Sequence, residues 1–357
     1  MPILSADYLR HSVCSRLFAA AGASEEEANT VGARLVESNL LGHDSHGVIR
    51  IPQYLAAIEA GAVQPGAPLE ITRETSASAV IDGHWGFGQV VASKAAAIAA
   101  RKAHSGGVAA VTVRNSYHIG RLGSYVEEMA ADGLLAILLA NAHGTGPCVV
   151  PWGGARGRLA TSPLAVGIPT TSDSLRGPMV LDMTTSSVAE GKVRVKRNRG
   201  ERVPDGWLQD AEGRPTNDPE SLYGTPRGSI LPFGGSRAAH KGYGLNVVVD
   251  LLAGALSGGG TTGTPDARHG NAFFLMVLDI FQFIPAHAYY QMVDGLVSFV
   301  KSSAPMADFE EVLVPGEIEL REREKRVEQG IFVEEETWQQ IHACADTLGI
   351  SLEDRSL

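Results

Sequence analysis

The chain has 357 residues, 44% of them hydrophobic, so it can bury a sizeable core in two domains or in one domain with appendages. Its formal net charge of -10 argues against nucleic acid or an anionic membrane as the main partner, because both attract clustered positive charge. Three widely separated cysteines outside any CxxC spacing, with no evident signal segment or membrane-length apolar run, predict a cytoplasmic protein without a disulfide framework.

The first region, residues 1–75, is predicted to be helical. Leu9, Val13 and Leu17 recur every four residues, as on one face of a helix. Ser24 and Glu27 then form a capping-box signature at the start of a second helix. We expect these helices to lead into residues 43–50.

Residues 43–50, HDSHGVIR, bring two imidazoles, a carboxylate, a hydroxyl and a guanidinium into two helical turns. If the helix continues through them, His46 and Arg50 share one face and can address one small ligand. A hydroxy or keto acid fits, since histidine exchanges protons near neutral pH and arginine holds carboxylates. A metal site at His43, Asp44 and His46 would need distant ligands, and Ser45 lacks the G-x-S-x-G elbow of a hydrolase nucleophile, so neither is expected.

Residues 76–304 alternate short β-rich runs with alanine-rich stretches and Gly/Pro turns, which predicts an α/β body. The polar stretch 194–218 is predicted to be a long ordered loop or a hairpin. Residues 258–263 satisfy GxGxxG, but the dinucleotide fingerprint needs a strand before it and a helix after it, so we expect a loop here. The expected strands are 77–81, 108–113, 135–139, 179–181 and 273–277.

Two strand ends carry candidate functional residues. His118 follows the strand at 108–113 and Asp182 follows the strand at 179–181, where α/β proteins gather ligands. The alternatives are a buried structural histidine and an N-cap for a helix at 187–193. Glycines at 232–235 and 242–244, with Lys241, allow the backbone to approach a phosphate, although such segments are more often simple turns.

The tail after Pro315 returns to helix, in a charged run at 317–326 and again at 334–348. We expect the charged run to be a solvated face and the tail to pack against the first region. The predicted organisation is a helical domain formed by residues 1–75 together with 305–357, and an α/β cofactor- and substrate-binding domain formed by residues 76–304.

Several strings, in this order along nearly the whole chain, resemble the type 2 malate/L-lactate dehydrogenase family, and the HIGR version is similar to its hydroxycarboxylate dehydrogenase branch. The strings are GHDSHG (42–47) with Arg50 and Tyr54, RNSYHIGRLG (114–123), PWGG with TSPLA (151–165), LDMTTS (181–186) with GK (191–192), LPFGG (231–235), HKGYGL (240–245) and VPGE (314–317).

This resemblance implies a non-Rossmann α/β body with a mixed sheet, completed by a helical unit from both ends of the chain. It further implies a homodimer, NAD or NADP as the cofactor, and an NAD(P)-dependent 2-hydroxyacid dehydrogenase that interconverts a 2-hydroxy acid and a 2-oxo acid. Reduction of cyclic imino acids in the same family and a non-catalytic small-anion-binding protein are the alternatives. The first interpretation is favoured because acid/base, anion-binding and glycine-turn elements occur together.

The resemblance also implies residue roles. His46 would pass a proton to or from the substrate oxygen in a relay with Ser45 and Asp182, while some relatives are described with the histidine matching His118 in that role. The implied substrate contacts are Arg50, Tyr54, His118, Ile119, Gly120, Arg121, Leu122 and Thr161; the implied cofactor contacts are Ser162, Met183, Thr184, Gly234, Gly235, Lys241, Pro315, Gly316 and Arg321; no metal is implied.

Two positions depart from the family pattern. Many relatives have an asparagine before the proline where this chain has Ser162, which puts one cofactor or substrate hydrogen bond in doubt. Many have a small residue where this chain has Arg121. Pointing inward, Arg121 would favour a substrate with a second acidic or polar end; pointing outward, it would be a surface side chain, which we expect.

Overall fold

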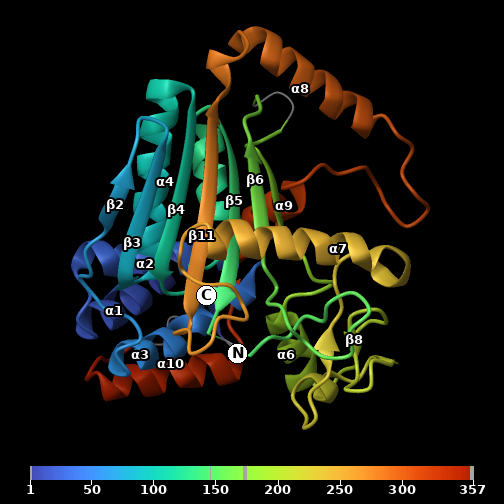
Figure 1. Cartoon of the computed structure of the whole chain (residues 1–357). Coiled ribbons are helices and arrows are strands. Elements are labelled where there is room, and N and C mark those ends of the chain that lie inside the picture. Colours follow the sequence, from blue (N-terminus) through green and yellow to red (C-terminus); the bar gives the residue numbers. More distant parts are fainter. Residues whose placement is uncertain (1, 145, 172–174, 354–357) are drawn as a thin grey trace.

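The computed structural model describes residues 2–144, 146–171 and 175–353, and its centre is a seven-stranded mixed sheet (Figure 1). The strand order is β2-β3-β4-β11-β5-β6-β7, in which β3 and β4 pair in parallel and the other neighbours are antiparallel. The strands are β2 (Glu70–Glu74), β3 (Ser78–Gly86), β4 (Val108–Ser116), β5 (Leu134–His143), β6 (Leu164–Ile168), β7 (Met179–Met183) and β11 (Gly270–Asp279).

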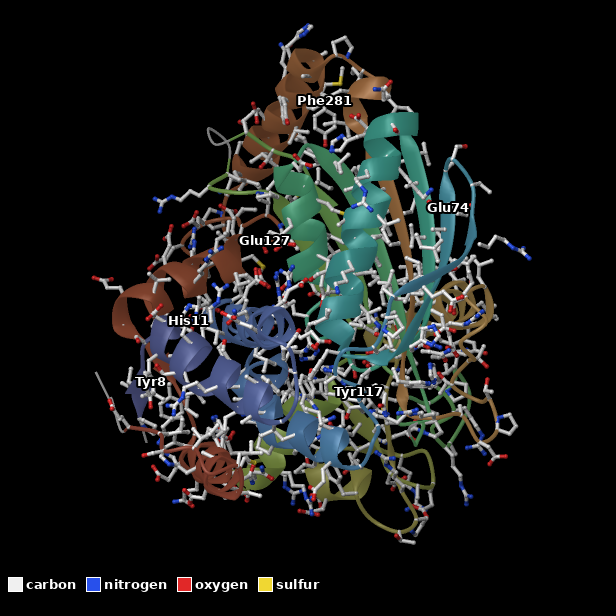
Figure 2. The ribbon with its side chains drawn as sticks, turned by 90° about the vertical axis from the view of Figure 1, so that its left-hand side faces the viewer. Tyr8, His11, Glu74, Tyr117, Glu127 and Phe281 are labelled. Carbon is white, nitrogen blue, oxygen red and sulfur yellow. The ribbon has the colours of Figure 1, made fainter. Side chains whose placement is uncertain are left out.

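Helices cover both faces of this sheet. Helices α4 (Gly88–Gly106) and α5 (Gly123–Ala131) pack on one face, while α7 (Gly235–Asp250) and the π-helix η5 (Leu251–Ala255) cross the other (Figure 1). The main core lies under α4 and α5, where Val111 and Phe273 of the sheet meet Ala95 and Val126 of the helices. Because β4 ends at Ser116, the segment that follows it emerges at the end of the sheet facing the N-terminal helices, as Tyr117 does in Figure 2.

The two ends of the chain form one helical layer there. Leu9, Leu35 and Tyr54 share a buried core with Ile331 and Trp338 from the C-terminal segment. Strand β1 (Ile3–Leu4) pairs antiparallel with β12 (Ile331–Phe332), which ties the two ends together. The helices of this layer are η1 (Tyr8–Ser15), α1 (Arg16–Ala20), α2 (Glu25–Leu40), η2 (Asp44–His46), η3 (Val48–Arg50), α3 (Ile51–Glu59), α9 (Glu317–Gln329) and α10 (Glu335–Thr347).

A smaller region follows β7 and has its own core of Val193, Leu208, Leu222 and Ile230. It contains α6 (Glu190–Asn198), the short helix η4 (Pro219–Leu222) and a three-stranded sheet of β8 (Leu208–Gln209), β9 (Pro215–Thr216) and β10 (Ser229–Ile230). At the opposite end of the large sheet, η6 (Ile280–Gln282) leads into α8 (Ala286–Lys301), which extends over that end in Figure 1.

The mixed sheet and all five expected strands are confirmed, as are the capping box at Ser24 and the loop at 258–263. Strands β2 and β6 were not predicted; β2 is a fully exposed edge without apolar alternation. The prediction for residues 194–218 is half right, because residues up to Asn198 complete α6 and the rest contains the hairpin β8–β9. Among the described residues, no helix is both long and apolar enough to span a membrane.

Candidate functional site

The predicted continuous helix through residues 43–50 is wrong, because Gly47 has an extended backbone (φ -90°, ψ -152°) that separates η2 from η3. Asn39 holds this break: its Oδ1 accepts from the Val48 amide at 2.8 Å, and its Nδ2 donates to Asp44 at 2.6 Å. A Cβ at position 47 would lie 2.2 Å from the Asn39 side chain, so only glycine fits. His46 and Arg50 therefore become neighbours through a folded turn, not through helical spacing.

His43 and Asp44 of this turn are anchored by α9. Arg326 donates to both oxygens of Asp44, at 2.6 and 3.0 Å, and His43 lies 3.6 Å from Glu319. The expectation that the charged run of α9 is merely a solvated face is thus wrong for Glu319 and Arg326. No cluster of His, Cys, Asp and Glu suited to a metal occurs among the described residues.

Arg326→Ala is expected to loosen the turn that carries His46 and to lower turnover about tenfold, with a loss of stability of about 1–3 kcal/mol. The cause is the loss of a two-pronged, charge-assisted hydrogen bond to Asp44. Steady-state kinetics and urea unfolding measure both effects. Arg176→Ala, which breaks an exposed pair with Glu324, is the control and should change neither; unchanged turnover in Arg326→Ala would show that α9 does not order the turn.

Two imidazoles face each other next to this turn. The rings of His46 and His118 have centroids 5.4 Å apart, and His46 Nδ1 lies 3.1 Å from the Ser45 hydroxyl. Burial, then the charges of Arg50 and His43, lowers the pKa of His46 to about 3. Burial and Arg50 likewise lower the pKa of His118 well below its usual value. Both rings are therefore neutral at physiological pH. In each ring, one nitrogen carries the proton and can donate a hydrogen bond, and the other nitrogen can accept one.

Arg50 is a partly buried cation beside these rings. Its Nε donates to the Ser45 carbonyl at 2.7 Å and its Nη1 to Gln53 at 2.6 Å. Within the part of the chain that the structure describes, it forms no ion pair, and burial lowers its pKa. A partly buried guanidinium that the charge of Glu190 reaches but that has no carboxylate in direct contact favours an anionic ligand.

A pocket of about 400 Å³ opens beside Ser45 and Arg50, with Gly191 and Arg194 of α6 on its other side. Gly191 packs so closely that a Cβ there would lie 2.9 Å from the Ser45 Cβ. The pocket is not lined by His46 or His118. It therefore adjoins the imidazole pair through Ser45 and Arg50.

His118 is held by Tyr54, whose hydroxyl lies 2.6 Å from His118 Nδ1. Gln89, which belongs to no motif that singles it out in the sequence, donates to the same hydroxyl at 2.7 Å. The side chains of Ile119 and Leu122 are in the main core, so these residues can contact a ligand mainly through their backbone. Gly120 between them has a left-handed backbone (φ +77°) that turns the chain here.

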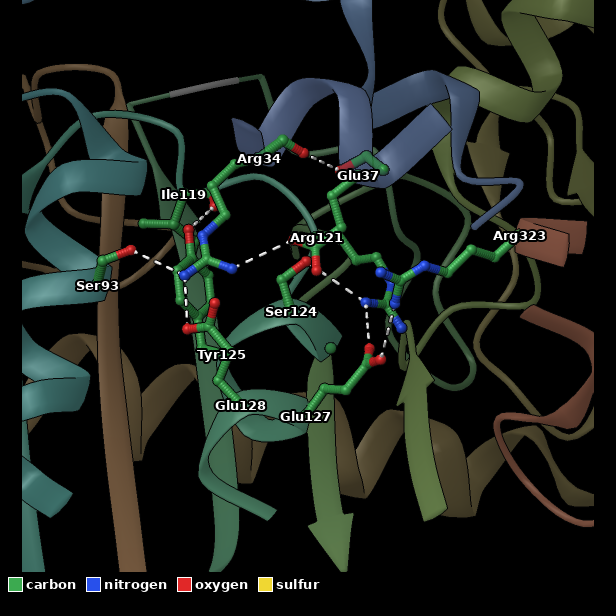
Figure 3. A network of polar contacts seen from close by, with 12 residues as sticks. Arg34, Glu37, Ser93, Ile119, Arg121, Ser124, Tyr125, Glu127, Glu128 and Arg323 are labelled. Atoms are coloured by element: carbon green, nitrogen blue, oxygen red, sulfur yellow. Dashed lines mark hydrogen bonds and ion pairs between the residues drawn. The ribbon is translucent and has the colours of Figure 1, made fainter. Parts of the chain in front are cut away.

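Asp182 and Arg121 form a buried charge network behind this segment. Asp182 accepts from the Gly123 amide at 2.7 Å and lies 3.8 Å from Arg121, while its N-cap alternative is wrong because α6 begins after Ala189. The expected surface position of Arg121 is also wrong: the residue is 4% exposed. The carboxylate of Glu127 lies 3.2 Å from the guanidinium of Arg121; Figure 3 shows both residues together with Arg323.

The polar contacts of Asp182 thus lead to Gly123 and Arg121, while those of His46 lead to Ser45. A direct Asp182–His46 bond is not part of the described structure. Glu127 and Arg323 were not singled out from the sequence, because neither belongs to one of the strings that carry the resemblance.

Most of the residues expected to hold a cofactor lie next to β6 and β7, whereas Lys241 and Arg321 lie on α7 and α9. Thr185 donates to the Thr161 carbonyl, and the Phe233 amide donates to Thr185, which brings the turn at Gly234 and Gly235 to the end of β7. The Val180 amide donates to the Pro315 carbonyl, so Pro315 and Gly316 lie beside the start of the same strand. Met183 ends β7, Thr184 follows it, Lys241 is exposed on α7, and exposed Arg321 pairs with Glu311 at 2.6 Å.

Two observations fit a bound dinucleotide in this region. Ser162 is fully buried, yet its hydroxyl has no hydrogen-bond partner in the described structure and its φ is +36°, a left-handed conformation that asparagine tolerates better. A Cβ at Gly242 would lie 2.1 Å from the Phe233 carbonyl, so glycine there lets α7 press against the turn. A bound cofactor could supply the hydrogen-bond partner that the Ser162 hydroxyl lacks, and the glycine turns would let it approach the backbone closely.

Comparisons with known proteins agree over nearly the whole chain. Residues 5–342 match the family model described as Malate/L-lactate dehydrogenase. The chain is 38% identical to hydroxycarboxylate dehydrogenase B of Escherichia coli O157:H7, over 95% of this chain and 93% of that protein.

Solved structures of other proteins have the same overall fold as this chain. A putative malate/lactate dehydrogenase from E. coli superimposes with a TM-score of 0.89 at 36% identity, covering 98% of this chain and 96% of the other. Δ1-Piperideine-2-carboxylate reductase from Pseudomonas syringae superimposes with a TM-score of 0.82 at 29% identity, covering 97% and 100% of the two chains.

Proposed function

The chain belongs to the malate/L-lactate dehydrogenase family, and from this premise we propose that it interconverts a 2-hydroxy acid and a 2-oxo acid, with NAD or NADP as the hydride carrier. The observation that carries the proposal is Arg50, a partly buried cation that lines the pocket, forms no ion pair among the described residues and lies next to two neutral imidazoles. An anchor for a carboxylate beside a proton acceptor is what oxidation of a 2-hydroxy acid requires.

In this proposal Arg50 holds the substrate carboxylate through its guanidinium fork. His46 is neutral and accepts the proton of the substrate hydroxyl during oxidation, while Ser45 orients the ring through Nδ1. In the reverse direction, His46 delivers the proton to the substrate oxygen, and the bound carboxylate favours this by offsetting the charge of Arg50, which after burial is the second cause of the lowered pKa of His46. Asp182 supports the site through Gly123 and Arg121.

The nicotinamide, when bound, supplies or accepts the hydride at the substrate carbon. We assign its binding to Ser162, Met183 and Thr184 near the reacting end, with the turn at Gly234 and Gly235 close by. The orphaned Ser162 hydroxyl supports this assignment. Pro315, Gly316, Lys241 and Arg321 would contact the more distant part of the dinucleotide.

Arg50→Lys is expected to raise the KM for the acid by about 10- to 100-fold with a smaller effect on kcat, since an ammonium cannot replace a planar fork. KM for the nicotinamide serves as the internal control and should stay within about twofold. An unchanged KM for the acid would mean that another residue holds the carboxylate.

The pH profile of oxidation is expected to stay flat between pH 8 and pH 5. A histidine base with an ordinary pKa of about 6.5 would lose activity about tenfold per pH unit below that value, whereas His46, with a pKa of about 3, stays neutral. A limb in kcat/KM near pH 6.5 would contradict this assignment.

A folding control belongs to that experiment. A lowered pKa in the folded state means that the unfolded chain binds more protons between pH 6.5 and pH 3, so stability falls as the pH falls through this window. Circular dichroism at each pH separates unfolding from loss of chemistry.

The direct test of the function is a screen of NADH and NADPH with pyruvate, oxaloacetate, phenylpyruvate, glyoxylate and cyclic imino acids, followed by cofactor absorbance. Consumption with a 2-oxo acid supports the proposal. Turnover confined to cyclic imino acids would favour the second candidate, an imino-acid reductase, to which the similarity with the piperideine-carboxylate reductase points. Ligand binding without turnover would favour a non-catalytic binding protein.

A second copy of the chain is the partner that we propose. Helix α8 exposes Met292, Leu296 and Phe299, each more than 60% accessible. A solvent-facing apolar helix of this kind is typical of a subunit interface. We therefore propose a homodimer in which a second copy covers α8.

A further inference from the structure

A buried hydrogen-bonded chain ends at Nδ1 of His118. It begins at Gln89, passes through the Tyr54 hydroxyl at 2.7 Å and ends at His118 Nδ1 at 2.6 Å. Tyr54 is 0% and Gln89 1% exposed, whereas His118 is partly exposed. The open part of the chain is therefore the imidazole, and its inner part is closed to water.

The first turn of α4 places Gln89 under His118. A Cβ at the preceding Gly88 would lie 2.2 Å from the His118 carbonyl, so glycine lets the helix start press against that backbone. The next two residues of α4, Val90 and Val91, are each buried in one of the two largest hydrophobic cores, and this packing fixes the start of the helix. The Gln89 amide consequently has little freedom to leave Tyr54.

Counting protons along this chain determines the state of His118. A phenol has one hydrogen and His118 is neutral, so its ring carries one proton in total. The Gln89 amide nitrogen donates to the Tyr54 oxygen, and His118 Nδ1 is the one other group in hydrogen-bond contact with this hydroxyl among the described residues. Tyr54 is closed to water, so its hydrogen is satisfied only when it points to His118 Nδ1. Nδ1 is then an acceptor without a proton, and the ring proton resides on Nε2.

We propose that Gln89 is a positioning residue which, through Tyr54, holds His118 in the tautomer with its proton on Nε2. His118 then presents an N–H donor on its open side. For catalysis, which rests on the proposed function, this donor holds the substrate oxygen while neutral His46 accepts or returns the proton. The two histidines are thus given different tasks by their neighbours: Ser45 for His46, and Tyr54 with Gln89 for His118.

The tautomer is measured directly by long-range ¹H–¹⁵N correlation NMR on the full-length protein, with His118→Gln used to assign the signals. The wild type is expected to show a bare Nδ1 and a protonated Nε2 at pH 7 to 9. A proton on Nδ1 in the wild type overturns the proposal without any variant at position 89.

Gln89→Glu sharpens the test. An ionised carboxylate cannot donate, so the Tyr54 hydrogen turns toward it and His118 Nδ1 must donate to the Tyr54 oxygen. A buried carboxyl has a raised pKa, and its neutral form can still donate. The expected result is a His118 tautomer that changes with rising pH in Gln89→Glu and stays constant in the wild type.

The matched control is Gln209→Glu, the same substitution at a buried glutamine whose amide donates to the Gly154 and Ala155 carbonyls. It should leave the tautomer unchanged. If Gln89→Glu does not fold, Tyr54→Phe replaces it: ring nitrogens that shift toward averaged values support the proposal, and unshifted ones overturn it.

Activity is the second readout. As the carboxyl introduced by Gln89→Glu ionises, kcat should fall about 100-fold, with KM changing less, because the donor on Nε2 is lost. An altered tautomer with unchanged kcat would overturn the catalytic consequence. Failure of the wild type to reduce any 2-oxo acid would refute the proposed function while leaving the NMR result interpretable.

Discussion

Replacing His46 by alanine is expected to lower turnover by roughly 100- to 10,000-fold, the range that a general acid or base typically contributes. The affinity for nicotinamide should be nearly unchanged, because none of the residues assigned to the cofactor belongs to the 43–50 turn. Single-turnover kinetics measure the chemical step, and quenching of protein fluorescence by the reduced cofactor measures binding.

The control for this variant is His43→Ala, which removes the neighbouring imidazole that pairs with Glu319. It should cost far less turnover. Near wild-type turnover in His46→Ala would move the proton-transfer role to His118 and leave Arg50 as the shared anchor. Loss of both binding and turnover would instead indicate that the turn had collapsed, which circular dichroism detects.

Arg121→Ala is expected to lower the free energy of unfolding by about 3–5 kcal/mol. The side chain is 2% exposed and contacts Glu127 and Asp182, so its removal takes the cation away from two carboxylates whose side chains are only 16% and 13% exposed. Urea unfolding followed by circular dichroism measures the loss. Arg34→Ala, which removes pairs with Glu37 and with the more exposed Glu128, should cost less.

The same variant separates two roles of Arg121. If the guanidinium contacted the substrate, catalytic efficiency for oxaloacetate would fall relative to pyruvate. Since it is paired with Glu127 (Figure 3) and lies 3.8 Å from Asp182, we expect both substrates to lose efficiency equally. A change of about tenfold in the ratio of the two efficiencies would mean that Arg121 contacts the substrate. A loss of stability below about 1 kcal/mol would show that the ion pairs of Arg121 contribute little to the free energy of unfolding.

Local sequence patterns predicted much of the fold, because strands and helix caps depend on residues that are close together in the sequence. The five strands were found from β-branched runs between turns, and the capping box at Ser24 from two residues three positions apart. Strand β2 was missed because an exposed edge strand, here EITRE, has no apolar face to alternate. The break at Gly47 was missed because it depends on Asn39, which replaces the helical hydrogen bond of the Val48 amide.

The candidate site was less predictable for the same reason. The strings along the chain named His46, Arg50, Tyr54 and His118, and the structure brings these four together. The orientation of Arg121 was missed because its partners Glu127, on α5, and Asp182, on β7, come together only when α5 packs on the sheet. Gln89 carries no motif, and its relation to His118 exists only once α4 has docked on the end of β4.

The measurement that tests the proposed chemistry most directly follows the hydride itself. Reduced nicotinamide carrying deuterium at both C4 positions is incubated with the protein and the 2-oxo acid that the screen identifies, and the product is analysed by mass spectrometry and NMR. We predict one deuterium at C2 of the resulting 2-hydroxy acid in the wild type and a rate reduced at least about 100-fold in His46→Ala. Cofactor that stays reduced with every acid, or a product without deuterium at C2, would contradict hydride transfer to a 2-oxo acid.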